Sequence, residues 1–117
     1  PEGYHFYNGS YFKHYRVAKT EPQAVAACAL DGARLARVPD LATHNFLKTL
    51  ISPPSNTWVD VHKVNGVWQY EQGFTSWYTG EPRTDGDCAH MWEKYNMNWN
   101  DIWCAEPLHY MCEIVIY

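Results

Sequence analysis

The sequence lacks the features that mark several common functional classes. It has no apolar run near the roughly 20 residues that cross a membrane, so we expect no membrane insertion. Its start shows no charged and apolar signal-peptide pattern, so we expect that any signal peptide has already been removed. The nine lysine and arginine residues are scattered and the formal net charge is −4, which argues against a nucleic-acid partner.

Catalytic signatures are missing as well. The six histidines show no H-E-x-x-H or other paired spacing, and no G-x-S-x-G turn or other nucleophile motif occurs. We therefore expect a binding protein and not an enzyme. The chain does have a globular balance of 46% hydrophobic and 19% charged residues, with six tryptophans and nine tyrosines, which predicts one domain over residues 1–117.

The four cysteines, Cys28, Cys88, Cys104 and Cys112, contain no close pair of the kind that binds zinc. An even number at wide spacing favours two disulfides and therefore a secreted protein in an oxidising, extracellular compartment. Asn8 begins an Asn-Gly-Ser glycosylation sequence, which adds weak support and makes Asn8 a candidate glycosylation site.

Two helices are predicted from their N-terminal caps. The first starts with Thr20 as N-cap, Pro22 in the first turn and Gln23 at the capping-box position, and Gly32 ends it. The second begins with Asp40 as its cap. The residues expected to face inward are Val25, Ala26, Cys28, Ala29 and Leu30 in the first helix, and Phe46, Leu47 and Leu50 in the second.

Strands are predicted on both sides of the helices. Residues 1–19 alternate around an Asn-Gly turn, which predicts a hairpin or two short strands. Residues 71–87 are polar and rich in glycine and proline, so we expect a long loop. The later strands are expected at 58–61, 67–70, 88–93, 97–103 and 108–115. This order predicts an α+β domain whose helices are segregated from an antiparallel sheet.

These positions favour one pairing of the cysteines. A bond between Cys28 and Cys112 would tie the first helix to the last strand, and one between Cys88 and Cys104 would tie two neighbouring late strands. The other two pairings would cross the hairpin between those late strands. They are less favoured, but they stay open at this point.

Five short motifs, in order, resemble those of the C-type lectin-like family, and the match covers nearly the whole chain. The family's W-I-G-L, G-x-W, W-x-x-G-E-P-N, W-N-D-x-x-C and closing C-E are similar to residues 58–61, 66–68, 77–83, 99–104 and 112–113. The resemblance implies the C-type lectin-like fold, with two helices packed on antiparallel sheets, a long ligand-binding loop, and disulfides Cys28–Cys112 and Cys88–Cys104.

The first residues refine this resemblance. Many relatives carry an additional cysteine pair near their start, whereas residues 1–4 and 10–12 keep the surrounding pattern without those cysteines. The chain is therefore most similar to short-form secreted lectins of invertebrates, bivalves especially. Those are humoral lectins, so the resemblance implies a role in innate immunity.

The resemblance also implies a sugar site that is incomplete for calcium. Sugar-binding members hold one Ca²⁺ with oxygen ligands, and vicinal sugar hydroxyls complete its shell. Glu81, Asn100 and Asp101 match three ligand positions. Arg83 stands where the family has an acceptor, and Gly86 stands where it has a further acid. A guanidinium only donates, and its charge opposes that of the ion.

We therefore favour a site that requires no cofactor, with calcium as the alternative; Asp85 and Asp87 could supply other ligands. Arg83 is expected to pair with Glu81 or Asp101 in place of the ion. The predicted sugar contacts are Glu81, Arg83, Asp85, Asn100 and Asp101. Such donors and acceptors favour an acetamido group, hence N-acetylglucosamine (GlcNAc) or N-acetylgalactosamine (GalNAc), partly because similar clam lectins exist.

Several aromatic side chains and one histidine surround this loop. The resemblance assigns Trp58, Trp68 and Trp99 to the core. One of Trp92, Tyr95 and Trp103 is a candidate for stacking on a sugar face, and His90, which alternates with Ala89 and Met91, is expected to face the ligand.

Two other functions compete with sugar binding. The changes at Arg83 and Gly86 are consistent with a domain that recognises a protein after losing sugar recognition. A binder of ice or mineral surfaces is a more distant alternative. Because all four cysteines are expected to pair internally and lectins gain avidity from several sites, we predict a non-covalent dimer.

Overall fold

The computed structural model describes residues 2–116, so Pro1 and Tyr117 of the predicted domain lie outside the described part. No helix in that part is long and apolar enough to cross a membrane. The elements are β1 (His5–Tyr7), β2 (Ser10–Lys19), α1 (Glu21–Leu30), β3 (Arg34–Leu35), α2 (Leu41–Leu50), β4 (Thr57–Val64), β5 (Val67–Gln69), β6 (Cys88–Trp92), β7 (Asn98–Ile102) and β8 (Leu108–Val115), with short 3-10 turns η1 (Glu71–Gly73) and η2 (Glu93–Tyr95).

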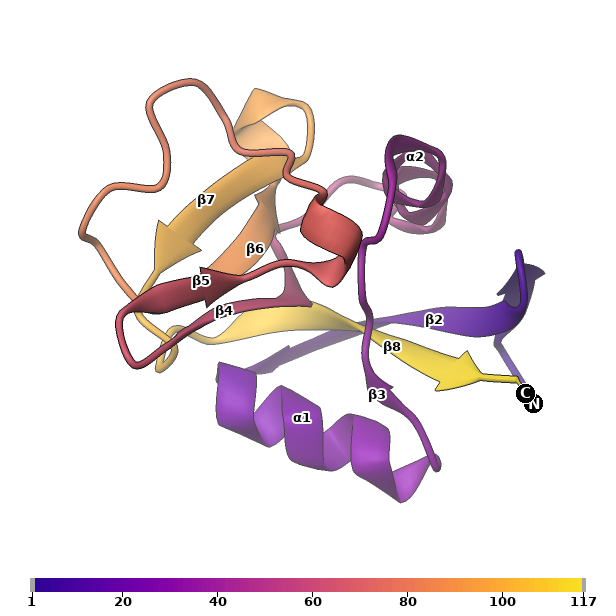
Figure 1. Ribbon diagram of the computed structural model, residues 1–117. Helices are drawn as coiled ribbons and strands as arrows, with labels where there is room; N and C mark the ends of the chain where they lie inside the picture. Colours follow the sequence, from indigo (N-terminus) through magenta and orange to yellow (C-terminus); the bar gives the residue numbers. More distant parts are fainter. Residues whose placement is uncertain (1, 117) are drawn as a thin grey trace.

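The strands form one mixed sheet in the order β1-β2-β8-β4-β6-β7, with β3 added to β8 and β5 to β4 (Figure 1). The pairings are antiparallel, as the sequence predicts, except that β4 runs parallel to β8, with Thr57 opposite His109. Strand β2 pairs with β8 over most of its length, so the first and last segments of the described chain lie side by side. The α+β fold class is confirmed.

Helix α1 starts as predicted. The Thr20 hydroxyl accepts from the Gln23 backbone and the Gln23 side chain accepts from the Thr20 backbone, which completes the capping box. Its inward face is narrower than expected, because only Ala24 and Cys28 are buried. Four of the five predicted inward positions are exposed, so their interpretation is wrong: Val25 (44%), Leu30 (89%), Ala26 and Ala29.

Helix α2 follows the prediction more closely. The Asp40 carboxylate accepts from the Thr43 backbone at 2.7 Å. Leu47 is completely buried, and Phe46 and Leu50 pack against the same core. This core lies between α2 and the β4, β6 and β7 strands, and a second one lies between α1 and β8 (Figure 1).

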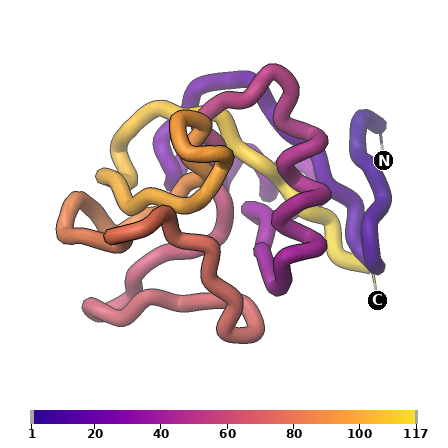
Figure 2. Tube along the Cα trace, turned by 90° about the horizontal axis from the view of Figure 1, so that it is seen from above, coloured from indigo at the N-terminus to yellow at the C-terminus, as the bar shows by residue number. Residues whose placement is uncertain are grey.

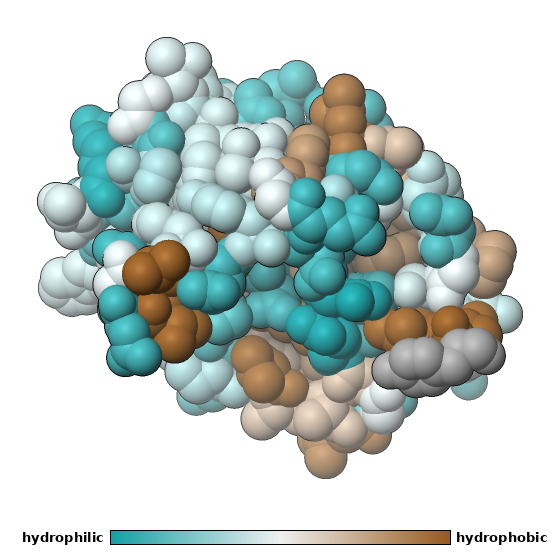
Figure 3. All heavy atoms as spheres, viewed as in Figure 1, coloured by the Kyte–Doolittle hydropathy of each residue, from teal (hydrophilic) through white to brown (hydrophobic). Residues whose placement is uncertain are grey.

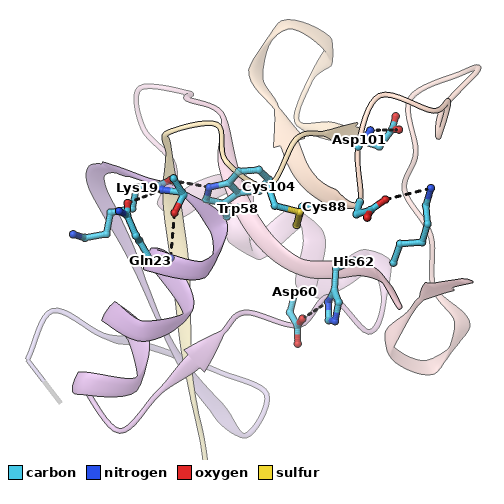
Figure 4. Close-up of a disulfide and its surroundings, with 12 residues drawn as sticks. Lys19, Gln23, Trp58, Asp60, His62, Cys88, Asp101 and Cys104 are labelled. Atoms are coloured by element: carbon cyan, nitrogen blue, oxygen red, sulfur yellow. Dashed lines mark hydrogen bonds and ion pairs between the residues drawn. A yellow bond between two sulfur atoms is a disulfide. The ribbon is translucent and has the colours of Figure 1, made fainter. Parts of the chain in front are cut away.

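Both predicted disulfides are present. Cys28 bonds to Cys112 and so ties α1 to β8, while Cys88 bonds to Cys104 and ties the start of β6 to the chain just after β7. Figure 4 shows the second disulfide beside the indole of Trp58, which belongs to the same buried cluster. Because this bond joins residues 16 apart in the sequence, the start of β6 and the chain just after β7 are held together covalently.

The predicted long loop, residues 71–87, follows β5, begins with η1 and runs to β6. Figures 1 and 2 both place it at the end of the molecule away from β1. On the face seen in Figure 3, the apolar residues form separate small groups among hydrophilic ones. The end of this loop, residues 81–86, lies next to β7 and contains most of the predicted site residues.

Candidate functional site

A single carboxylate on β7 holds the 81–86 segment in place. Asp101 is completely buried, and its Oδ1 accepts from the backbone N–H of Arg83 at 3.0 Å. Its Oδ2 accepts from the backbone N–H groups of Asp85 at 3.0 Å and Gly86 at 3.3 Å. Three hydrogen bonds to one buried carboxylate fix the course of this segment, which is a role that the sequence did not reveal.

Gly86 explains why the family's further acid is missing. A Cβ added at Gly86 would lie 2.0 Å from the carbonyl oxygen of Ile102 and 2.4 Å from the amide nitrogen of Trp103. Real side chains do not approach backbone atoms so closely, so only glycine fits here. The 81–86 segment is therefore packed directly against the peptide that follows β7.

Arg83 pairs with Glu81, which is one of the two partners predicted for it. Both Nε and a terminal nitrogen of Arg83 donate to Glu81 Oε2, at 3.2 and 2.9 Å. The Glu81 side chain is 1% exposed and the Arg83 side chain 66% exposed. The carboxylate thus lies beneath the surface and holds a guanidinium above it. The peptide bond before Pro82 is cis.

Glu81 and Asp101 have pKa values shifted in opposite directions. Burial raises the pKa of Glu81, and its contact with Asp101 raises it further, which outweighs the effect of Arg83. Burial also opposes ionisation of Asp101, but the contact with Glu81 and the hydrogen bonds from the backbone outweigh it and lower its pKa. Asp101 is therefore the ionised member of the pair over the wider pH range.

The other predicted residues lie apart from this centre or at its edge. Asn100 is half-buried and its Nδ2 lies 3.2 Å from Nε2 of His90, its register partner on β6. Neighbouring residues of a strand point to opposite faces, so Asn100 and Asp101 do not converge. His90 is 1% exposed and does not face a ligand, contrary to the prediction. Strand β6 is buried on both faces, so alternation along it carries no information about exposure.

A calcium ion would find only part of a coordination shell here. Carboxylate oxygens of Glu81, Asp85 and Asp101 lie within 4.8 Å of one another, and Glu81 Oε1 is buried with no hydrogen-bond partner in the described structure. Calcium takes six to eight oxygens. Both Asp101 oxygens already accept backbone hydrogen bonds, Arg83 occupies the other Glu81 oxygen, and Asn100 is turned away. In this arrangement the residues do not fit the ion.

The aromatic side chains divide into buried and surface groups. Trp58 and Trp99 are completely buried and Trp68 packs against the core, as predicted. Near the loop, Tyr78 and Tyr95 stack with ring centroids 3.9 Å apart, and Trp92 packs edge-on against Tyr95 at 4.6 Å. Trp103 differs from all of these because it is 68% exposed.

The candidate glycosylation site lies elsewhere. Asn8 is exposed in the turn between β1 and β2, with a φ of 48°. The hydroxyl of Ser10, the third residue of its sequence motif, is buried and donates to Glu113 at 2.6 Å. Glycosylation at Asn8 stays a prediction.

Known proteins with similar sequences share one domain type. The family model described as "Lectin C-type domain" matches residues 17–114. The chain is similar to C-type lectin domain family 10 member A of Rattus norvegicus, with 31% identity over 122 residues that cover 92% of this chain and 39% of the rat protein. It is also similar to perlucin of Haliotis laevigata, with 25% identity over 126 residues that cover 97% and 81% of the two chains.

Among solved structures, the herring type II antifreeze protein has a TM-score of 0.91 against this chain, with 22% sequence identity. The likeness covers 100% of this chain and 99% of that one. At this level of identity the likeness shows a shared fold and nothing about what either protein binds.

Proposed function

The chain belongs to the family of lectin C-type domains, and from this premise we propose that it is an extracellular lectin that binds carbohydrate at the 81–86 segment. The observation that carries the proposal is the ion pair between buried Glu81 and exposed Arg83, beside Asp101. It places a fixed donor at the surface and a carboxylate directly below it, where the resemblance expects calcium and sugar to meet.

The chemistry of this pair favours a particular sugar group. The exposed guanidinium has donors to offer to a carbonyl oxygen, and the exposed Asp85 carboxylate offers acceptors to an N–H or hydroxyl group. An acetamido group has both a carbonyl acceptor and an N–H donor. We therefore propose GlcNAc or GalNAc as the ligand, bound without calcium by Arg83 and Asp85, with Glu81 holding the guanidinium from below and Asp101 holding the backbone of the segment.

Calorimetric titration with GlcNAc and GalNAc, in calcium and in EDTA, tests this proposal. We expect equal affinity in both buffers and a loss on the order of tenfold in Arg83→Ala, because a charge-assisted hydrogen bond is removed. Arg34→Ala is the matched control, since Arg34 is another exposed arginine paired with a carboxylate, Asp60, on a different part of the surface. Binding that EDTA abolishes would overturn the calcium-free site, and undiminished binding in Arg83→Ala would overturn the role of the guanidinium.

The same experiment decides between sugar and protein recognition. If neither sugar binds in either buffer, the lectin proposal fails and the closed Glu81–Arg83 pair favours recognition of a protein instead.

Because both disulfides are internal and no free cysteine is present among the described residues, we propose that any dimer is non-covalent. Light scattering at high concentration checks this, and a monomer mass would contradict the dimer.

A further inference from the structure

Trp103 lies on the surface although its neighbours in the chain are held firmly. Trp103 is 68% exposed, more than any other aromatic residue in the described part of the chain. It lines a hollow of about 360 Å³ together with Thr84, Asp85, Ile102 and Glu106. An indole ring that stays on the surface does not contribute the stability that its burial would give the fold. An exposed indole held in a fixed position beside a hollow therefore indicates a binding surface.

The backbone on both sides of Trp103 is fixed relative to the 81–86 segment. Gly86 packs against the Ile102–Trp103 peptide with no room for a side chain. The next residue, Cys104, is bonded to Cys88 at the start of β6. The N–H of Glu106 donates to the Trp103 carbonyl at 3.0 Å and closes a turn. The indole is therefore presented from a covalently and sterically fixed position.

Asp85 connects this hollow to the proposed sugar site. It lines the hollow, and one of its carboxylate oxygens also lies within 4.8 Å of carboxylate oxygens of Glu81 and Asp101. A ligand that extends past Asp85 from the Glu81–Arg83 pair would thus come over Trp103. The two sites are neighbours on one loop surface.

The chemistry of the hollow fits a neutral sugar ring. Its charged lining residues are two carboxylates, Asp85 and Glu106, and they offer only acceptors. The face of an indole carries negative charge in its quadrupole, which attracts the C–H edges of a pyranose, while the hydroxyl groups of the ring can donate to the carboxylates. An acidic sugar would be repelled by both carboxylates.

We propose that Trp103, Asp85 and Glu106 form a second subsite that binds the next ring of a neutral oligosaccharide whose terminal sugar occupies the Glu81–Arg83 site. This inference rests on the proposed function and deepens it. It makes the protein a reader of at least two linked sugars and not of a monosaccharide alone.

The test compares GlcNAc with its β-linked dimer by calorimetric titration. We expect the wild type to bind the dimer about fivefold more tightly, which is the size of an aromatic contact. Trp103→Ala should lose that gain and keep its affinity for GlcNAc within about twofold, and Trp103→Phe should keep part of the gain. Phe6→Ala is the matched control, because Phe6 is an aromatic residue 59% exposed on β1.

An NMR spectrum of the indole N–H groups gives an independent readout. The signal absent in Trp103→Phe should shift with the dimer and stay in place with GlcNAc. The subsite would be overturned, and the proposed function left standing, by either of two results. One is that Trp103→Ala still prefers the dimer as the wild type does; the other is that the wild type binds both sugars with equal affinity. A wild type that binds neither sugar would overturn both. If a lysine-rich peptide shifts this signal and the dimer does not, the hollow binds a cationic protein segment and not a sugar. That result would also overturn the subsite.

Discussion

The buried carboxylate of Asp101 gives the sharpest test of how the loop is held. Asp101→Asn keeps the shape of the side chain and replaces one acceptor oxygen with a donor. In the better of its two orientations the amide oxygen faces the N–H groups of Asp85 and Gly86, and the NH₂ group faces the N–H of Arg83. The N–H of Arg83 then faces another donor and has no acceptor, and the other two bonds lose their charge. The cost is about 3 kcal/mol.

Amide hydrogen exchange measures this cost at the three residues concerned. About 3 kcal/mol corresponds to exchange about 100-fold faster at the backbone N–H groups of Arg83, Asp85 and Gly86. Asp87→Asn is the matched control, since Asp87 is 70% exposed and forms only a 3.6 Å ion pair with a lysine. Unchanged protection of the three amides in Asp101→Asn would refute the reasoning, because the carboxylate would then not be what holds the segment.

Three further predictions concern the rest of the molecule. Gly86→Ala should lower the free energy of unfolding by about 3 kcal/mol in urea, because its Cβ would meet the Ile102 carbonyl oxygen; an unchanged midpoint would contradict this. Arg37→Ala should cost about 3 kcal/mol in the same assay, because it leaves the carboxylate of Glu113, which is 3% exposed, without its guanidinium; a change below the error of the fit would count against that ion pair. Burial lowers the pKa of His44 to about 4, below the value of 6.5 in the unfolded chain, so on acidification the unfolded state binds the proton first. The free energy of unfolding should therefore keep its full value above pH 6.5 and fall by up to about 3 kcal/mol as the pH drops towards 4. In His44→Phe this fall should be shallower, and equal slopes in the two proteins would disprove the assignment.

Features that depend on neighbouring residues could be read from the sequence. The caps at Thr20 and Asp40 placed the starts of both helices, because capping needs only residues within one turn. The order and spacing of motifs indicated the fold and both disulfides, which are present. The Arg83–Glu81 pair was also foreseen as one of two options, since the residues are two apart on one turn.

Features that depend on distant packing could not be read. The exposure of Val25 and Leu30 follows from how narrowly α1 docks on β8, and the burial of His90 follows from the central place of β6 in the sheet. The role of Asp101 needs the 81–86 segment to fold back on β7, a contact between residues 15 to 18 apart. The lack of space for a side chain at Gly86 is likewise caused by Ile102 and Trp103, which come after β6 and at the end of β7 in the sequence.

The departure from the family's calcium ligands at Gly86 has a physical origin in the packing, and this leads to a last prediction. Gly86 cannot carry an acid because it packs on the Ile102–Trp103 peptide, and this packing brings its N–H onto Asp101. The Asp101 oxygens are thus occupied by the backbone. Arg83→Asn restores the asparagine of the family's E-P-N motif, removes the opposing charge and supplies one acceptor. Gly86 still carries no acid, Asn100 is still turned away, and both Asp101 oxygens are still occupied.

We therefore expect Arg83→Asn to show no calcium affinity in the micromolar range by calorimetry or by terbium luminescence, and to bind sugar as weakly as Arg83→Ala does. The wild type titrated with calcium under the same conditions is the reference. Calcium binding by Arg83→Asn would mean that the Asp101 carboxylate can leave its three backbone partners for an ion. In that case the amides of Arg83, Asp85 and Gly86 would lose protection when calcium is added, and Arg83 alone would account for the loss of the family's metal site.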